Sequence, residues 1–183
     1  MIHIIKMLYR NGGGYKISCI STHECWPTWR KSVPKCSPQK ELFLGSWCVE
    51  PDYINLKPKG HPVQPELEDV FKKVDEFMAE LDCTHIYLAS DEARVEFEFR
   101  KKYGDKILVN KREYYDDIYY GNRLAYIGEV HFDRKDDDYF KGIEYFSSLY
   151  ILSRCIGLVG GNCGGSQAAV FMNNLKYKKN VHI

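Results

Sequence analysis

The chain has 183 residues, 28% of them charged and 44% hydrophobic, with 26 lysines and arginines against 25 aspartates and glutamates. The resulting formal charge of +1 argues against a general polyanion or nucleic-acid binder, which would be markedly basic. The hydrophobic fraction excludes wholesale disorder. Mean hydropathy is −0.43, and no apolar run approaches the roughly 20 residues of a membrane-spanning helix. Composition therefore predicts one soluble domain that does not cross a membrane.

Seven cysteines cannot all pair within one chain. The first residues have neither the apolar run nor the cleavage site of a signal peptide. We expect a cytoplasmic protein with reduced thiols. A peripheral location at the inner face of the membrane is compatible with this expectation. The group Cys19, His23, Cys25 and Cys36 fits no standard zinc spacing, so no metal site is expected.

The first part of the chain is poorly patterned. Neither a helical nor a strand period lasts over residues 1–43, and three prolines lie between Trp26 and Pro38. We expect an N-terminal segment over 1–43 and a Rossmann-like nucleotide-sugar-binding domain over 44–183.

Orderly elements begin with a predicted strand over 43–49. A helix starting near Gln64, with Pro65 in its first turn, carries one apolar stripe at helical spacing. The stripe consists of Leu67, Val70, Phe71, Val74, Phe77, Met78 and Leu81. A buried strand over 86–89 follows, and a second helix opens at Asp91 and ends near Gly104.

The second half repeats this alternation. A strand is predicted over 107–109, a loop rich in tyrosine and aspartate over 111–138, and a helix over 139–154. Another strand covers 156–159, a glycine turn leads into a fourth helix, and a last strand begins at Val181. Strands alternating with helices through short connections predict an α/β fold, a Rossmann-like parallel sheet with helices on both faces.

The strongest candidate site is the glycine turn between the strand over 156–159 and the fourth helix. Its candidate ligand-binding residues are Asn162, Cys163, Gly164, Gly165 and Ser166. Glycines let a backbone approach a ligand closely, and the first N–H groups of a helix favour anions. Neither a phosphate loop ending in Gly-Lys-Ser/Thr nor a G-x-G-x-x-G pattern is present. A tight turn without a ligand therefore remains an equal alternative.

Two further segments carry polar groups. Asp91 and Glu92 follow a predicted strand and could face a nucleotide or sugar, while Ser90 has the ordinary alternative of capping the helix. A stiff loop follows the strand over 43–49, with Pro58, Gly60 and Pro62 shaping it. Its chemical groups are Asp52, Tyr53, Lys57 and His61, which could serve an acceptor or a phosphate. The alternative is a surface loop with solvated charges.

The aspartates Asp136, Asp137 and Asp138 resemble metal-binding aspartates of some sugar transferases. They lie in a charged run before a helix, where solvation and helix capping explain them.

Taken in order, these segments resemble the C-terminal half of GDP-fucose-dependent fucosyltransferases, above all the α1,6-fucosyltransferases and the bacterial nodulation fucosyltransferases. The resemblance runs from about Leu44 to the end of the chain. Asp52 stands where the first family motif ends, and His61-Pro62 opens the helix. Residues 87–92, Tyr-Leu-Ala-Ser-Asp-Glu, are similar to the family's Tyr-Leu-Ala-Thr-Asp-Asp. The last motif corresponds to residues 146–166.

The resemblance implies the donor-binding half of a GT-B-type enzyme that transfers fucose from GDP-fucose to a glycan hydroxyl, with inversion and without a metal. It implies that the turn at Gly164 to Ser166 holds the pyrophosphate and that Asp91 and Glu92 line the donor pocket. Ser148 stands where the family has a guanine-facing residue, often Asp, and Asp52 would organise the reactive end.

One departure from the family concerns the phosphate-binding arginine. It is expected at about Val49, where the chain reads Cys-Val-Glu-Pro-Asp over 48–52. We expect a truncated gene product whose start arose by a frameshift or misassembly, and which needs a second Rossmann-like domain or associates with itself. The alternative is an inactive nucleotide-binding remnant or interaction module. The absence of G-x-G-x-x-G argues against a dehydrogenase.

Overall fold

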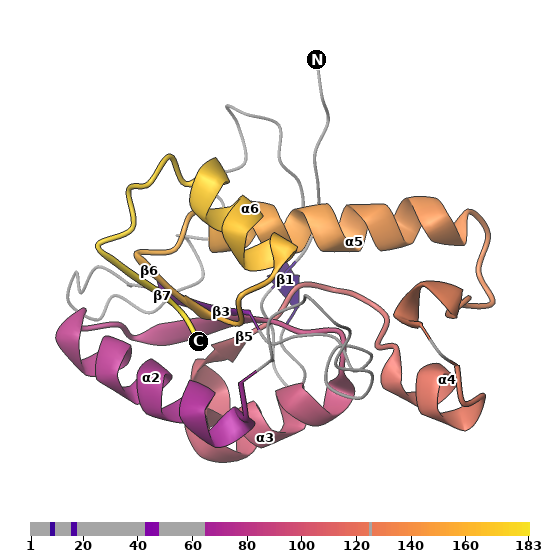
Figure 1. The fold of residues 1–183 in the computed structure, drawn as a ribbon, viewed down its shortest axis with the longest axis horizontal. Coiled ribbons are helices and arrows are strands. Elements are labelled where there is room, and N and C mark those ends of the chain that lie inside the picture. The colour runs from indigo at the N-terminus through magenta and orange to yellow at the C-terminus, as the bar shows by residue number, and fades with distance from the viewer. Residues whose placement is uncertain (1–7, 10–15, 18–42, 48–64, 125) are drawn as a thin grey trace.

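The computed structural model describes residues 8–9, 16–17, 43–47, 65–124 and 126–183. Its centre is a parallel sheet of five strands in the spatial order β5-β4-β3-β6-β7 (Figure 1). The strands are β3 (Phe43–Trp47), β4 (His85–Ala89), β5 (Ile107–Leu108), β6 (Gly157–Gly160) and β7 (Lys179–His182). The predicted α/β fold with a parallel sheet is confirmed.

Helices cover both faces of this sheet. On one face lie α2 (Leu67–Glu80) and α3 (Ala93–Tyr103), and on the other lie α5 (Asp137–Leu152) and α6 (Gly164–Met172) (Figure 1). The connection between β5 and α5 holds the short helix α4 (Asp116–Gly121) at one side of the sheet. Two short strands, β1 (Leu8–Tyr9) and β2 (Lys16–Ile17), pair antiparallel in a separate ladder.

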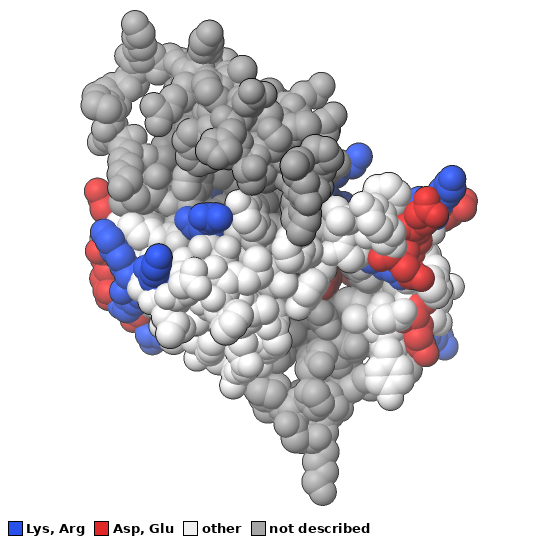
Figure 2. Space-filling view, turned by 90° about the horizontal axis from the view of Figure 1, so that it is seen from above, with Lys and Arg blue, Asp and Glu red and all other residues white. Residues whose placement is uncertain are grey.

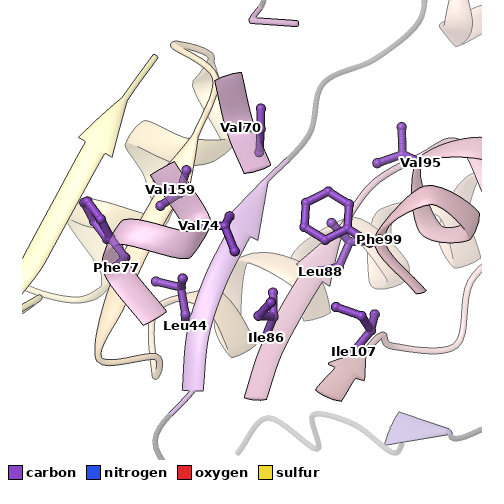
Figure 3. Packing of buried hydrophobic residues seen from close by; sticks show 10 residues of the cluster. All are labelled: Leu44, Val70, Val74, Phe77, Ile86, Leu88, Val95, Phe99, Ile107 and Val159. Atoms are coloured by element: carbon purple, nitrogen blue, oxygen red, sulfur yellow. The ribbon is translucent and has the colours of Figure 1, made fainter. Parts of the chain in front are cut away.

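The core follows from the alternation of side chains along the strands. Leu44, Ile86, Leu88, Ile107 and Val159 lie on one face, where Val70, Val74 and Phe77 of α2 and Val95 and Phe99 of α3 meet them (Figure 3). On the other face, Tyr87, Ala89 and Leu158 contact the second cluster, with Leu149, Leu152 and Ala169 from α5 and α6. The apolar stripe predicted for the first long helix is confirmed, because its buried members all belong to the first cluster.

Several boundaries differ from the predicted ones. Helix α2 begins at Leu67, since Glu66 is still extended, so Pro65 precedes the helix. The stretch predicted as a loop over 111–138 contains α4 and a 3₁₀ turn (Ile127–Glu129). Strand β7 begins at Lys179, two residues earlier than predicted, because an edge strand tolerates polar residues. Among the described residues, no helix has the length and apolarity needed to cross a membrane.

Candidate functional site

The chain reverses its winding direction between β3 and β6. Strand β3 pairs with both β4 and β6, with Trp47 opposite Ala89 on one side and opposite Gly160 on the other. Helix α2, the next described element after β3, packs on one face of the sheet, whereas α6 after β6 packs on the other. Such a switch point leaves a crevice at the carboxyl ends of the strands, where ligands bind in open α/β sheets.

The predicted glycine turn lies at this switch point. Strand β6 ends at Gly160, and α6 begins at Gly164 with Cys163 as its N-cap. Ser166 is buried, and its hydroxyl donates to the Gly161 carbonyl at 2.5 Å and accepts from the Cys163 N–H at 3.3 Å. The turn is therefore held in shape by Ser166, whose hydroxyl is already bonded within the turn.

The two sides of the turn before α6 differ in how much space they leave for a ligand. A Cβ atom built on Gly164 would meet no atom within 4 Å, so there is open space beside the first residue of the helix. Asn162 accepts a hydrogen bond from the Gln167 side chain at 3.0 Å, which closes one side of the turn. A helix N-terminus beside open space is an arrangement suited to an anion.

The end of β4 carries a buried ion pair. Asp91 pairs with Arg112, and their side chains are only 11% and 4% exposed. The Tyr115 N–H donates to the Asp91 carbonyl at 2.8 Å, which ties the segment after β5 to the end of β4. Burial lowers the pKa of Arg112. The sequence prediction included Asp91 and missed Arg112, because nothing in the spacing of 21 residues links them.

Glu92 is completely buried beside this pair. Among the described residues, neither of its carboxylate oxygens has a hydrogen-bond partner, and the Arg94 Nε lies 3.6 Å from one of them. Burial raises the pKa of Glu92; the charge of Arg94 lowers it in part, and that of Asp116 raises it further. Ser90 accepts from the Glu92 N–H at 3.2 Å, so it shapes the turn before α3, while the N-cap position belongs to Glu92.

Ser148 lies in a polar network inside the fold. Its hydroxyl lies within hydrogen-bonding distance of two acceptors, the Asn110 Oδ1 at 3.2 Å and the Glu144 carbonyl at 3.0 Å. Tyr87 also donates to the Asn110 Oδ1, at 2.8 Å. Burial raises the pKa of Tyr87 far above its usual range. Ser148 is fully buried, and its partner Asn110 follows β5. The glycine turn follows β6, and strands β4 and β3 lie between β5 and β6.

Two clefts flank the segment after β5, where it runs beside α5. The larger, of about 260 Å³, is lined by Asn110, Lys111, Glu113, Arg134, Phe140, Ile143, Glu144 and Ser147. The smaller, of about 180 Å³, is lined by Asp91, Arg112, Tyr115, Ile127, Gly128, Lys141 and Tyr145. Neither cleft includes the glycine turn, and most of their polar lining was not among the predicted site residues.

The acidic run at the start of α5 pairs with cationic side chains of the protein. The Asp137 carboxylate lies 2.6 Å from the Arg134 Nε and 3.2 Å from the Lys141 Nζ, and it accepts from the Phe132 N–H at 3.1 Å. Burial raises the pKa of Asp137, but the hydrogen bonds, led by that from Arg134, lower it overall. His131 and Asp138 are close enough to join Asp137 around an ion, yet two cations already occupy its carboxylate.

The predicted site residues fall into separate places. The glycine turn follows β6, and Asp91 and Glu92 follow β4, so the two groups flank β3 about 10 Å apart at the spacing of parallel strands. Ser148 belongs to neither group. Asp52, Tyr53, Lys57 and His61, together with the position near Val49 where an arginine was expected, lie outside the described residues. No protein-family model matches the chain, and no curated protein matches it.

Proposed function

We propose that this chain is the donor-binding half of a GT-B-type glycosyltransferase that transfers fucose from GDP-fucose to a glycan hydroxyl. One observation carries the proposal: a glycine turn leads into the N-terminus of α6 at the switch point of a parallel sheet. The open space beside Gly164 supports a close approach of a diphosphate. The motifs over 87–92 and 146–166, which resemble those of the fucosyltransferases, support the choice of donor.

In the proposed reaction, the oxygen of the acceptor hydroxyl forms a bond to the fucose C1 on the face opposite GDP, and the hydroxyl proton is released to solvent. The bond between C1 and the β-phosphate oxygen breaks, and its electron pair leaves with GDP. The first N–H groups of α6 stabilise the negative charge that develops on the leaving diphosphate. Asp52 organises the reactive end, and the acceptor and the other half of its site come from a second domain. The proposal requires no metal ion.

A second candidate is a nucleotide-binding module without transferase activity. It is favoured by the state of Arg112, the buried arginine at the carboxyl edge, which is paired with Asp91. In the fucosyltransferases, an arginine stabilises the negative charge of the leaving GDP. Arg112 is already paired with the Asp91 carboxylate, so it would stabilise the charge of a diphosphate less.

Calorimetric titration with GDP and GDP-fucose tests donor binding in both candidates. Gly164→Asp places a carboxylate at the first residue of α6, where it repels phosphate but favours the helix dipole. We expect this variant to bind GDP at least about tenfold more weakly, a loss of 1.4 kcal/mol, without losing thermal stability. Gly121→Asp is the matched control, because an added Cβ also meets open space there, at the end of α4.

The outcomes separate the candidates. Undetectable binding of GDP to the parent chain, or equal binding by Gly164→Asp, would defeat the donor assignment. Donor hydrolysis that disappears in Asp52→Ala would establish the transferase, whereas binding without turnover would establish the inactive module.

A further inference from the structure

We propose that the larger cleft, between the segment after β5 and the first half of α5, binds one neutral sugar ring. This site goes beyond the donor site proposed at the glycine turn. The residues on which the argument depends are Asn110, Lys111, Glu113, Arg134, Phe140 and Glu144.

The size of the cleft limits its ligand. Its volume of about 260 Å³ lies just below the 300–1,000 Å³ typical of pockets for drug-sized ligands. A single sugar ring is small enough for such a space, whereas a whole nucleoside-diphosphate sugar is not.

One part of the cleft lining is apolar. The Phe140 ring is 44% exposed, and the Arg134 guanidinium carbon lies 5.5 Å from its centre. Ile143, one turn further along α5, extends this wall. An exposed aromatic ring can cover the C–H face of a sugar, which is apolar although the rim of the sugar carries hydroxyl groups.

The polar groups that line the cleft offer both hydrogen-bond donors and acceptors. Arg134 donates two bonds to Glu144, at 2.6 and 3.1 Å, and a carboxylate with about four lone-pair positions can still accept from hydroxyls. The Asn110 amide uses its oxygen for Tyr87 and Ser148 and one N–H for the Glu144 carbonyl, so one N–H remains. Sugar hydroxyls both donate and accept, and they match this mixture.

The charges of the cleft favour a neutral ligand. Lys111 and Arg134 are balanced by Glu113 and Glu144. Figure 2 shows acidic and basic side chains gathered together at the side of the molecule where α4 and the start of α5 lie, and again at the opposite side of this face. An anion would gain little from a cleft without net charge.

The cleft is distant from the proposed diphosphate site. It lies beside the end of β5, and the glycine turn follows β6, three strands away in the order β5-β4-β3-β6. At about 4.8 Å for each strand spacing, the two sites are roughly 14 Å apart. A ligand in the cleft and a diphosphate at α6 can therefore bind at the same time.

The test is saturation-transfer NMR of the full chain with four methyl pyranosides, those of glucose, galactose, mannose and N-acetylglucosamine, and with glucuronate and methyl phosphate as anionic probes. We expect at least one pyranoside to bind with a Kd near 1 mM, about −4 kcal/mol. Phe140→Ala should weaken that binding about two- to tenfold, as loss of an aromatic contact does. Glu144→Gln should weaken it as well.

Phe171→Ala is the control, because Phe171 is 83% exposed on α6 and lies outside the cleft. Absence of pyranoside binding, an equal loss in Phe171→Ala, or binding of the anionic probes alone would overturn the proposal. Displacement of the pyranoside by GDP would also overturn it, since the two sites would then be one. Binding of GDP that survives in Phe140→Ala keeps the donor proposal standing whatever the fate of the sugar site.

Discussion

Asn110 joins three parts of the chain that are far apart in sequence. It accepts from Tyr87 on β4 and from Ser148 on α5, and it donates to the Glu144 carbonyl. Its side chain is buried, and the buried Tyr87 hydroxyl donates to it, whereas the Ser148 hydroxyl can also donate to the Glu144 carbonyl. The residue thus holds the wall of the larger cleft as well as the core beneath it.

Asn110→Ala should lower the free energy of unfolding by about 1–3 kcal/mol, because it leaves the buried Tyr87 hydroxyl without its acceptor, while Ser148 keeps the Glu144 carbonyl. Urea unfolding followed by circular dichroism measures this loss. Asn122→Ala is the control, since that exposed side chain donates to the Ile118 carbonyl one turn away and to no other residue in the described part of the chain, and the substitution should change stability by less than about 0.5 kcal/mol. Equal losses in the two variants would contradict the role of the network.

Glu92 should make the protein less stable as the pH rises. Its pKa is raised by burial above the ordinary 4.5, so the folded chain holds a proton that the unfolded chain releases. Stability therefore falls with increasing pH from about 4.5 up to the folded-state pKa. Glu92→Gln removes this loss, and we expect it to be more stable than the parent at pH 7 and similar at about pH 4.

Urea midpoints at both pH values measure the effect of this substitution. Glu98→Gln on the same helix is the control, because its side chain is 35% exposed and pairs only with Lys101. A stabilisation of equal size at both pH values would show that packing, and not the proton, is responsible.

The positions of the candidate site residues were predictable only where a strand end defines them. Asp91, two residues after the end of β4, could be placed at the carboxyl edge of the sheet from the sequence, and it lies there in the structure, although its role as a site residue stays a prediction. Its partner Arg112 could not, since the pairing depends on how the segment after β5 folds back over β4. The burial of Ser148 depends on how α5 is rotated about its own axis. That rotation follows from the packing of the helix against the sheet, so the sequence alone could not predict it.

At the level of the elements, two glycines differ in whether the structure leaves room for a side chain. A Cβ built on Gly157 in β6 would lie 2.6 Å from the Leu81 Cδ1 and 3.0 Å from the Lys179 carbonyl oxygen, so α2 and β7 approach the strand closely. A Cβ on Gly142 in α5 would meet nothing within 4 Å.

Gly157→Ala should therefore destabilise the protein by about 1–3 kcal/mol, because backbone and core atoms must move apart. Gly142→Ala should stabilise it by about 0.5–1 kcal/mol, because alanine restricts the unfolded chain and favours the helix. Thermal unfolding distinguishes them, at about 2–4 °C for each kcal/mol in a chain of this length. A melting temperature that changes in the same direction in both variants would be inconsistent with this packing.

Long periodic elements were predictable and short ones were not. The stripe of α2 spans four turns and marks the helix without help from the rest of the fold. Helix α4 has six residues, too few for a repeating apolar face, so its aspartates and tyrosines looked like a loop. Strand β7 is recognisable only by its pairing with β6, since Lys179 and Asn180 are polar.

For the whole molecule, alternation of strands and helices predicts a parallel sheet but leaves the order of its strands open. The order depends on pairing between segments far apart in sequence, such as β3 with β6, which are separated by more than a hundred residues. That pairing creates the switch point, so the position of the proposed donor site follows from the fold as a whole. The proposed donor site and the proposed sugar cleft then lie at different parts of one edge.

Hydrogen exchange in the presence of GDP should show that the proposed donor site and the proposed sugar cleft are separate. A diphosphate at the start of α6 would accept hydrogen bonds from its first N–H groups, so amides in residues 161–169 should exchange about tenfold more slowly when GDP is tenfold above its Kd. Amides of α3 over 93–103, which start at the same edge from β4, serve as the internal control. Protection confined to residues 110–115 and 140–147 would instead place GDP in the larger cleft, and equal protection throughout would mean that the ligand stabilises the fold without revealing its site.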